Sequence, residues 1–220
     1  MSRIRYLGVR AIPRLVAYRL FSQLFHYRAI RCVWVDLRNW RQDSNPKNTF
    51  EVRSLSAEEI RSQPKLMGED RRDVDQYLGA GLQAFGAVKD SSIISFMWIS
   101  PHPPSLDAQF TLEFDDEPAY FYNAFTLPEF RGLGLMPAVL RAALASCLSR
   151  GRRGAISFID VLNYPSLAAF RSAGFKTVST FRSAKLFGKH WIQPTSGQKM
   201  PRFRVQRVIS EKQSPRPLCD

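Results

Sequence analysis

The fold of this chain is decided by one stretch, Thr126-Leu127-Pro128-Glu129-Phe130-Arg131-Gly132-Leu133-Gly134-Leu135-Met136. A predicted strand ends at its first residue, a turn with two glycines follows, and a helix begins directly after the turn. The first N–H groups of a helix have no partner within it, and the helix dipole adds positive potential there. The stretch therefore predicts a phosphate-binding turn, and the alternative is that the glycines only shape the turn.

The helix after this turn shows itself by its apolar period. Apolar residues recur three and one positions apart, as helical packing requires. They are Met136, Val139, Leu140, Ala143, Leu144, Cys147 and Leu148. Gly151 and Gly154 end the helix, and the nearly all-apolar residues 155–161 are typical of a strand in the middle of a sheet.

A second segment follows that strand, Asn163-Tyr164-Pro165-Ser166-Leu167-Ala168-Ala169-Phe170-Arg171-Ser172-Ala173-Gly174-Phe175. An asparagine at a strand end precedes a helix over 165–173, and Gly174-Phe175 closes the helix. The two segments, in this order and at this distance, resemble the GNAT acyltransferase superfamily. The resemblance covers about residues 50–210 and implies an α/β fold with a mixed, mostly antiparallel central sheet flanked by helices.

The resemblance rests on a few specific positions. The family's Arg/Gln-x-x-Gly-x-Gly/Ala loop and its Asn…Tyr…Gly-Phe helix correspond to Arg131, Gly134, Met136, Asn163, Phe170, Gly174 and Phe175. The family transfers acetyl or another acyl group from acyl-CoA to an amine by direct attack, without a covalent enzyme intermediate. Acetyl-CoA or another acyl-CoA is therefore the expected co-substrate.

The resemblance also implies where CoA binds. The pyrophosphate is expected on the backbone amides of residues 131–136, and the pantetheine arm along the exposed edge of the preceding strand. Amides near Thr126 are expected to polarise the thioester carbonyl. The implied cofactor-binding residues are Phe125, Thr126, Phe130, Arg131, Gly132, Leu133, Gly134, Leu135, Met136, Asn163 and Phe170.

Two residues depart from the family pattern. Met136 replaces a small residue of the loop, and Phe170 replaces the tyrosine that protonates the leaving thiolate in many relatives. A phenyl ring cannot donate a proton, so the acid is expected to be Tyr164 or a water, unless the protein has lost catalysis. The expected catalytic residues are Tyr164, Tyr122 and Asn123.

The base that deprotonates the acceptor ammonium is left open. Its candidates are Glu117, Tyr120, Tyr122, Asn123 acting through a water, and His190. Each has a structural alternative, such as a solvated turn residue for Glu117 or packing for the two tyrosines, which share one strand face. Three histidines without a spacing pattern and three distant cysteines predict no metal site and no disulfide framework.

The remaining elements surround these segments. Strands are predicted at 50–55, 82–88, 92–99, 110–114, 119–126 and 203–209, and another begins at Phe175. A turn at Lys89-Asp90 joins the strands at 82–88 and 92–99 into a predicted hairpin. Ser56 and Glu59 form a capping-box pattern that opens a short helix, with a second helix within 62–75. The predicted domains are a basic extension of helix and strand at 1–49, the acyltransferase domain at 50–210 and a frayed tail at 211–220.

Positive charge is concentrated at the two ends of the chain. Lys and Arg number 32 against 19 Asp and Glu, a net charge of +13. Residues 1–35 hold seven arginines and no acid, and residues 176–220 hold ten basic and two acidic residues. Such ends attract phosphates, anionic lipids or acidic partners. Without interleaved aromatics or a reading motif, nucleic acid is not the expected partner.

The N-terminal segment, residues 1–31, mixes arginines with apolar and aromatic residues. Pro13 can open a helix over 14–29, and a strand at 32–37 follows. Three interpretations stay open: a helix packed on the domain, a helix on an anionic membrane surface, or a cleaved presequence. No apolar run approaches the roughly 18–20 residues of a transmembrane helix, so the expected location is the cytoplasm, free or peripheral to the membrane.

The sequence thus predicts an N-acyltransferase whose acceptor is a small amine. Basic ends favour an anionic acceptor, for example a nucleotide- or lipid-linked amino sugar, and disfavour the cationic surface of a protein lysine substrate. Two alternatives remain. One is an inactive protein of the same fold that binds CoA or a partner, and the other is a binding module for membranes or nucleic acid.

Overall fold

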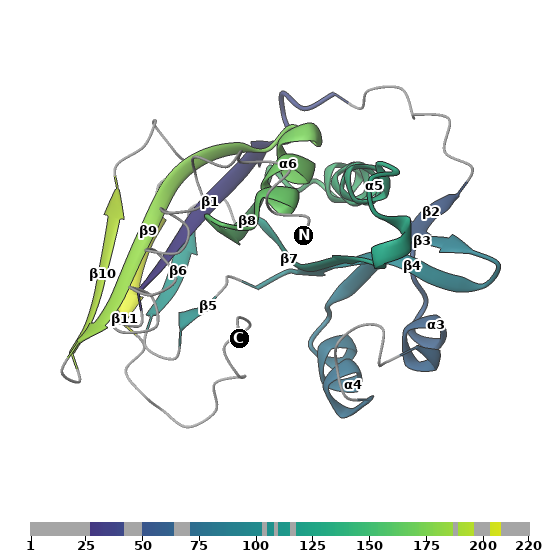
Figure 1. Cartoon of the computed structure of the whole chain (residues 1–220), viewed down its shortest axis with the longest axis horizontal. Coiled ribbons are helices and arrows are strands. Elements are labelled where there is room, and N and C mark those ends of the chain that lie inside the picture. The colour runs from purple at the N-terminus through teal and green to yellow at the C-terminus, as the bar shows by residue number, and fades with distance from the viewer. Residues whose placement is uncertain are drawn as a thin grey trace.

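The computed structural model describes residues 27–41, 50–63, 71–102, 105–107, 110–114, 118–186, 189–195 and 203–207. It contains an eight-stranded sheet with the order β10-β9-β1-β8-β7-β4-β3-β2 (Figure 1). The strands of this sheet are β1 (Arg28–Asp36), β2 (Glu51–Ser54), β3 (Gln83–Lys89), β4 (Ser92–Ser100), β7 (Ala119–Thr126), β8 (Gly154–Asp160), β9 (Lys176–Leu186) and β10 (Lys189–Thr195). All neighbours are antiparallel except β7 and β8. The predicted fold class, a mixed and mostly antiparallel sheet flanked by helices, is confirmed.

Helices cover both faces of this sheet. α5 (Leu135–Ser149) and α6 (Tyr164–Ser172) lie on one face, while α3 (Ala57–Ser62) and α4 (Arg71–Gly79) lie on the other (Figure 1). Each face therefore has its own apolar core. The core under α5 includes Val139 and Phe121, and the core under α3 and α4 includes Ile60 and Trp98.

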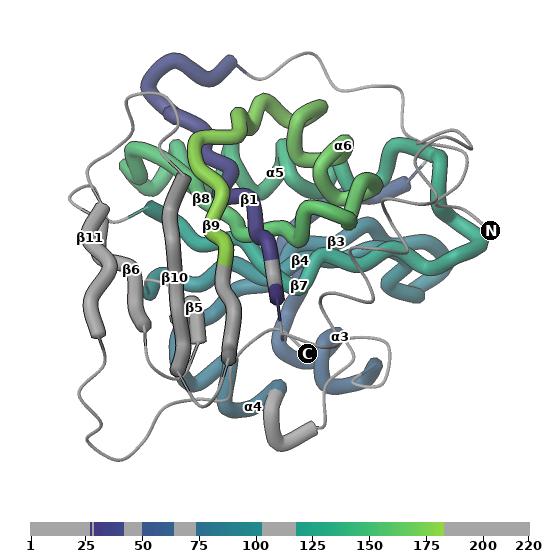
Figure 2. The backbone as a smooth tube through the Cα atoms, turned by 60° about the vertical axis from the view of Figure 1, so that its left-hand side comes forward, coloured from purple at the N-terminus to yellow at the C-terminus, as the bar shows by residue number. Residues whose placement is uncertain are grey.

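Strand β1 lies in the middle of the sheet, between β8 and β9 (Figure 2). Trp34 of β1 lies over Gly154 of β8 so closely that a Cβ at Gly154 would collide with the indole ring. The predicted boundary after residue 49 therefore does not separate this strand from the domain. The predicted helix over 14–29 is also wrong at its end, because Arg28 and Ala29 pair with β9. Its start lies outside the described residues.

A second, three-stranded sheet has the order β11-β6-β5. Its strands are β5 (Ser105–Asp107), β6 (Phe110–Phe114) and β11 (Phe203–Arg207). The sequence predicts two successive strands around an acidic turn at 115–118, and both strands form, but they belong to different sheets. Strand partners are set by contacts distant in sequence, so local patterns do not reveal this separation.

Two local predictions are confirmed on the other side of the molecule. The predicted hairpin forms from β3 and β4, and its turn lies one residue later than predicted, at Asp90 and Ser91. Both residues have positive φ, as two-residue hairpin turns require. The capping box forms at α3: the Ser56 hydroxyl accepts from the Glu59 amide, and the Glu59 carboxylate accepts from the Ser56 amide. The second helix, α4, lies later in the chain than the predicted 62–75.

Candidate functional site

The site begins where two parallel strands of the sheet separate. β7 and β8 pair only at Ala119 with Ala155 and at Tyr120 with Ile156. Beyond these pairs β7 continues to Thr126, and its edge facing β8 has no strand partner among the described residues. An open strand edge can accept a ligand that pairs like a further strand.

A bulge in β7 lies at the separation point. Asn123 has φ +49, and the register between β4 and β7 shifts by one residue at this point. Asparagine tolerates this backbone conformation better than most residues, which explains the residue type without a catalytic role. Bulges occur frequently beside functional sites, where they redirect a strand. Here the bulge sets which backbone groups of the last residues point to the open edge.

The backbone of Thr126 faces that open edge. The amide of Leu127 donates to the carbonyl of Ile94 at 3.0 Å. Because the backbone groups of an antiparallel strand point alternately toward and away from its partner, those of Thr126 point away from β4. The Thr126 side chain is turned into the protein, where its hydroxyl lies 2.8 Å from the hydroxyl of the buried Ser95.

The loop after β7 presents unoccupied backbone N–H groups. Gly132 and Gly134 both have positive φ, at +87° and +73°, which makes glycine the favoured residue at each. Helix α5 starts at Gly134 without a side-chain cap. Within the part of the chain that the structure describes, the amides of residues 132–136 have no hydrogen-bond partner. These groups lie at the positive end of a 15-residue helix, an arrangement that suits an anion.

The residues before the glycines anchor the loop. Pro128–Phe130 form a short 3-10 turn, and the Arg131 amide donates to the carbonyl of Pro128. That amide is therefore already bonded, and the free amides begin at Gly132. The Phe130 ring packs edge-on against Phe50, with the Lys89 ammonium 5.6 Å from the ring centroid.

Two cations lie beside the turn that precedes the free amides. Besides Lys89, the Arg131 side chain returns to β7, where its Nε donates to the Thr126 carbonyl at 3.0 Å. The guanidinium carbon lies 5.7 Å from the centroid of the Phe125 ring. The first turn of α5 contains no acidic residue. The local charge therefore favours an anion.

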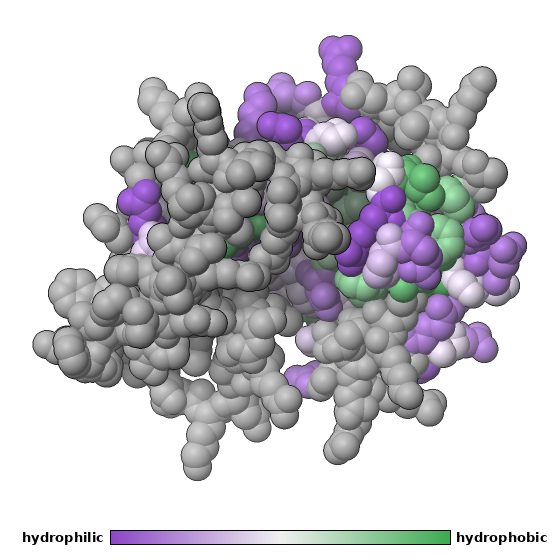
Figure 3. All heavy atoms as spheres, viewed as in Figure 1, coloured by the Kyte–Doolittle hydropathy of each residue, from purple (hydrophilic) through white to green (hydrophobic). Residues whose placement is uncertain are grey.

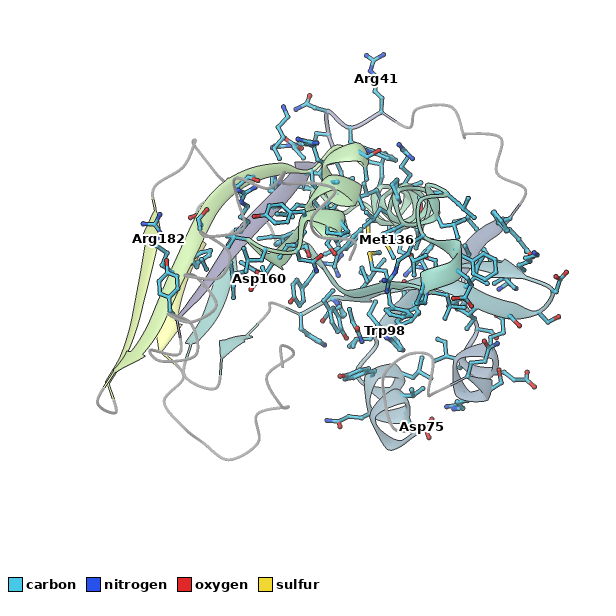
Figure 4. The ribbon with its side chains drawn as sticks, in the orientation of Figure 1. Arg41, Asp75, Trp98, Met136, Asp160 and Arg182 are labelled. Atoms are coloured by element: carbon cyan, nitrogen blue, oxygen red, sulfur yellow. The ribbon has the colours of Figure 1, made fainter. Side chains whose placement is uncertain are left out.

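The two departures from the family pattern have clear structural positions. The Met136 side chain packs against the core under α5. Figure 4 shows Met136 on the α5 side of β7 and Trp98 on the α4 side. Phe170 is 2% exposed and contacts Phe175 edge-on, with ring centroids 4.9 Å apart. Phe170 is thus part of the core under α5 and α6.

In the second predicted segment, residues 163–175, both ends of α6 are bonded by side chains of the protein. Asn163 caps α6, its side-chain oxygen accepting from the amide of Ser166 at 3.3 Å. At the other end of α6, the Trp40 indole N–H donates to the carbonyl of Ala173 at 3.1 Å, and its ring covers Gly174. The structure thus brings Asn163 and Phe170 into a well-packed unit on the far side of the strand separation.

The candidate catalytic residues lie on different elements. Tyr122 points to the α4 side, where it stacks on Tyr120 at 5.2 Å and meets Tyr77 of α4 edge-on at 6.3 Å. Asn123 is exposed at the bulge, and Tyr164 is the first, half-buried residue of α6. Glu117 and the side chain of His190 lie outside the described residues.

An aromatic row, missed by the sequence analysis, crosses the sheet on the α4 side. Each ring contacts the next in the order Trp98, Tyr77, Tyr122, Tyr120, Phe158 and Phe181. Alternation in each strand could have signalled that these residues share a face, but the strand order could not be known.

The described cysteines are not nucleophiles. Burial raises the pKa of Cys32 to about 12 and that of Cys147 to about 11. Within the described ranges, no group of three or more His, Cys, Asp or Glu side chains could hold a metal ion. The helices in these ranges include none that is long and apolar enough to cross a bilayer.

Several solved structures share this fold. A protein described as a GNAT-family acetyltransferase from Novosphingobium aromaticivorans aligns with a TM-score of 0.52 and 15% identity, over 72% of this chain and 63% of that chain. A glucosamine N-acetyltransferase region of a fungal multi-domain β-N-acetylglucosaminidase gives 0.52 and 12%, over 80% and 22%. This chain therefore spans less than two thirds of the length of either protein. At these identities the similarity concerns the fold.

The sequence comparison identifies the family. No functionally curated protein matches the chain. The sequence profile of the acetyltransferase (GNAT) family matches residues 34–175, from β1 to the end of the α6 junction. This match covers more than half of the chain and includes the strand separation, the glycine loop and both helices that follow. The chain belongs to the acetyltransferase (GNAT) family.

Proposed function

We propose that this protein is an acyl-CoA-dependent N-acyltransferase that transfers acetyl or another acyl group to a small amine. The observation that carries the proposal is the uncapped start of α5, whose free amides lie directly after the open edge of β7. A negatively charged phosphate end and an amide-containing arm are the ligand features that suit these two neighbouring surfaces.

The proposed binding mode follows from the polar groups of the loop and of the strand edge. The CoA pyrophosphate would accept from the amides of residues 132–136, with Lys89 and Arg131 adding positive potential. The pantetheine arm would lie along the open edge at Thr126, whose amide points to this side. Leu133 is 51% exposed and offers apolar contact beside the loop. Figure 3 shows hydrophobic and hydrophilic residues side by side over this end of the molecule.

The proposed reaction is direct aminolysis of the thioester. The acceptor nitrogen attacks the carbonyl carbon, the C–S bond breaks, the thiolate leaves with the electron pair, and the amine loses one proton. A water held by Asn123, or Tyr122 in its phenolate form, would take that proton, and the phenol of Tyr164 or a water would protonate the thiolate. The buried thiols of Cys32 and Cys147 make a cysteine acyl intermediate at either residue unfavourable.

The proposed acceptor is a small amine, with amino sugars tested first because the basic ends of the chain favour anionic sugar derivatives. The acceptor would approach from the α4 side, because α5 and α6 cover the other face of the strand separation. We also propose that residues 1–31 contact an anionic membrane surface. Residues 1–26 of this segment lie outside the described ranges.

The test is release of free CoA from acetyl-CoA in the presence of an amine panel. The panel holds amino sugars with and without phosphate, an aminoglycoside, a polyamine and an aromatic amine. Amine-dependent release that fails in the Tyr164→Phe or Tyr122→Phe variant would support the reaction and assign the residue. Tight CoA binding without release for any amine would instead favour the inactive CoA-binding protein, to which the burial of Phe170 points.

A further inference from the structure

The side chain of Arg131 joins the two halves of the proposed CoA site. Its Nε donates to the Thr126 carbonyl at 3.0 Å, and its guanidinium carbon lies over the Phe125 ring. Because Thr126 ends β7 and Arg131 immediately precedes the free amides, this bond closes a short ring of backbone. The orientation of the loop is thereby tied to the strand edge.

The strand end of this connection is itself fixed. Ser95 of β4 is fully buried, and its hydroxyl donates to the Phe125 carbonyl at 3.2 Å while lying 2.8 Å from the Thr126 hydroxyl. The Thr126 side chain is thus held toward the core, and its carbonyl is held toward the open edge. Buried, mutually bonded hydroxyls permit little local movement.

We infer that Arg131 is a positioning residue, whose side-chain N–H holds the free amides at a fixed place relative to the open edge of β7. The inference rests on the proposed function, in which one ligand contacts both surfaces at once. A ligand that joins two subsites gains affinity only when their spacing is set before it binds. What matters is the donor at Nε, and the positive charge of the guanidinium is secondary.

Three substitutions separate the donor from the charge. Glutamine Nε2 stands at the same number of bonds from Cα as arginine Nε, so Arg131→Gln retains an N–H donor for the Thr126 carbonyl but removes the charge. Arg131→Met retains the length and removes both. Arg150→Gln, at the opposite end of α5, removes one charge far from the loop and is the matched control.

The experiment is calorimetric titration of the full chain with CoA and with two smaller ligands that each carry part of it, adenosine 3′,5′-bisphosphate and pantetheine. Arg131→Met is expected to weaken CoA binding about tenfold and that of each smaller ligand less than about twofold. Arg131→Gln is expected to bind all three ligands within about threefold of the unaltered protein, as is Arg150→Gln. Equal melting temperatures show that the variants fold.

Two results would overturn the inference. Equal weakening of bisphosphate binding in Arg131→Gln and Arg131→Met would mean that the charge contacts phosphate directly. Unchanged CoA affinity in Arg131→Met would mean that the bond does not position the loop. Absence of CoA binding by the unaltered protein would contradict the proposed function, which is a different outcome.

A ligand-free measurement tests the positioning role independently of CoA. Backbone NMR order parameters of Gly132 and Gly134 are expected near the rigid value of about 0.85 in the unaltered protein and in Arg131→Gln. In Arg131→Met they are expected to fall below about 0.6. Equal order parameters in all three proteins would contradict the inference, whatever the protein binds.

Discussion

The two strand–loop–helix units of this protein have the same order of elements, but a side chain caps the helix in one unit and not in the other. In the β8–α6 unit, Asn163 caps the helix and its oxygen occupies the Ser166 amide. In the β7–α5 unit, Gly134 opens the helix at φ +73° without any side-chain cap. The first unit satisfies its own backbone, whereas the second leaves N–H groups for something outside the chain.

This difference explains why one unit is structural and the other is suited to binding. A side-chain cap stabilises a helix by about 1 kcal/mol, so an uncapped start forgoes that stabilisation. Here the uncapped start also faces an open strand edge and nearby cations, Lys89 and Arg131. The junction at α6 instead carries Phe170, Phe175 and Trp40, which pack its ends against the core.

The largest expected effect comes from removing a core side chain of the β8–α6 unit. Phe170→Ala removes a ring that is 2% exposed and contacts Phe175, and should lower the free energy of unfolding by about 3–5 kcal/mol. Leu133→Ala, in the open loop, should change it by less than about 0.5 kcal/mol because Leu133 is 51% exposed. Urea titrations measure both. Similar losses for the two variants would contradict the distinction between the units.

The next effect comes from adding a carboxylate at the uncapped helix start of the β7–α5 unit. Gly134→Asp places a carboxylate beside the free amides, where it competes with an anion and repels it, so acetyl-CoA binding should weaken by about a hundredfold. Gly151→Asp is the matched control, since Gly151 has φ +75° and equally open space around a Cβ, at the other end of α5. Calorimetric titration measures both variants. Equal affinities would contradict the assignment of the loop.

A smaller effect follows from removing the side-chain cap of α6 in the β8–α6 unit. Asn163→Ala frees the Ser166 amide and should lower the free energy of unfolding by about 1 kcal/mol. Asn163→Asp retains the acceptor and should remain within a few tenths of the unaltered protein, as thermal unfolding will show. An equal loss in both variants would mean that the asparagine acts through another contact, including the CoA contact expected from the sequence.

The smallest effect concerns the third helix start, at α3. Hydrogen bonds from Arg53 and from the Ser56 amide lower the pKa of Glu59 to about 2 from an ordinary 4.5. The stabilisation is therefore complete above about pH 4.5 and is lost as the pH falls toward 2. For this pair, in which each side chain is about one third exposed and solvent weakens the attraction, it should amount to about 0.5 kcal/mol.

Stability measured between pH 5 and 2 tests this capping box. Glu59→Gln should show a shallower acid loss than the unaltered protein, and Glu58→Gln, one residue earlier on the same helix, should not. Identical profiles for the two variants would show that the capping box contributes nothing measurable.

The sequence predicts the parts of this fold that local patterns determine. The glycine turn, α5, β8, α6 and the capping box are each encoded by periodicity, caps or glycines within a short stretch. The place of β1 between β8 and β9 could not be predicted, because the pairing of Val33 and Trp34 depends on residues far along the chain. The separate small sheet was missed for the same reason.

At the candidate site the backbone was more predictable than the side chains. The free amides follow from Gly132 and Gly134, but the turn of Arg131 back to Thr126 depends on the end of β7. Ser95 was a detectable signal, since it is the single polar residue inside the apolar run 93–99, and Asn123 likewise interrupts its strand at the bulge. Neither pattern alone states what it contacts.

The most direct test of CoA binding at the start of α5 compares the two helix starts in one measurement. Amide ¹H–¹⁵N chemical shifts are followed while acetyl-CoA is titrated into the labelled protein. If CoA binds at the start of α5, the largest shift changes are expected at Gly132, Gly134, Leu135 and Met136. A clear change is expected at Thr126, and little change at Ser166. Changes concentrated at the start of α6, with none in the loop before α5, would contradict CoA binding at the start of α5.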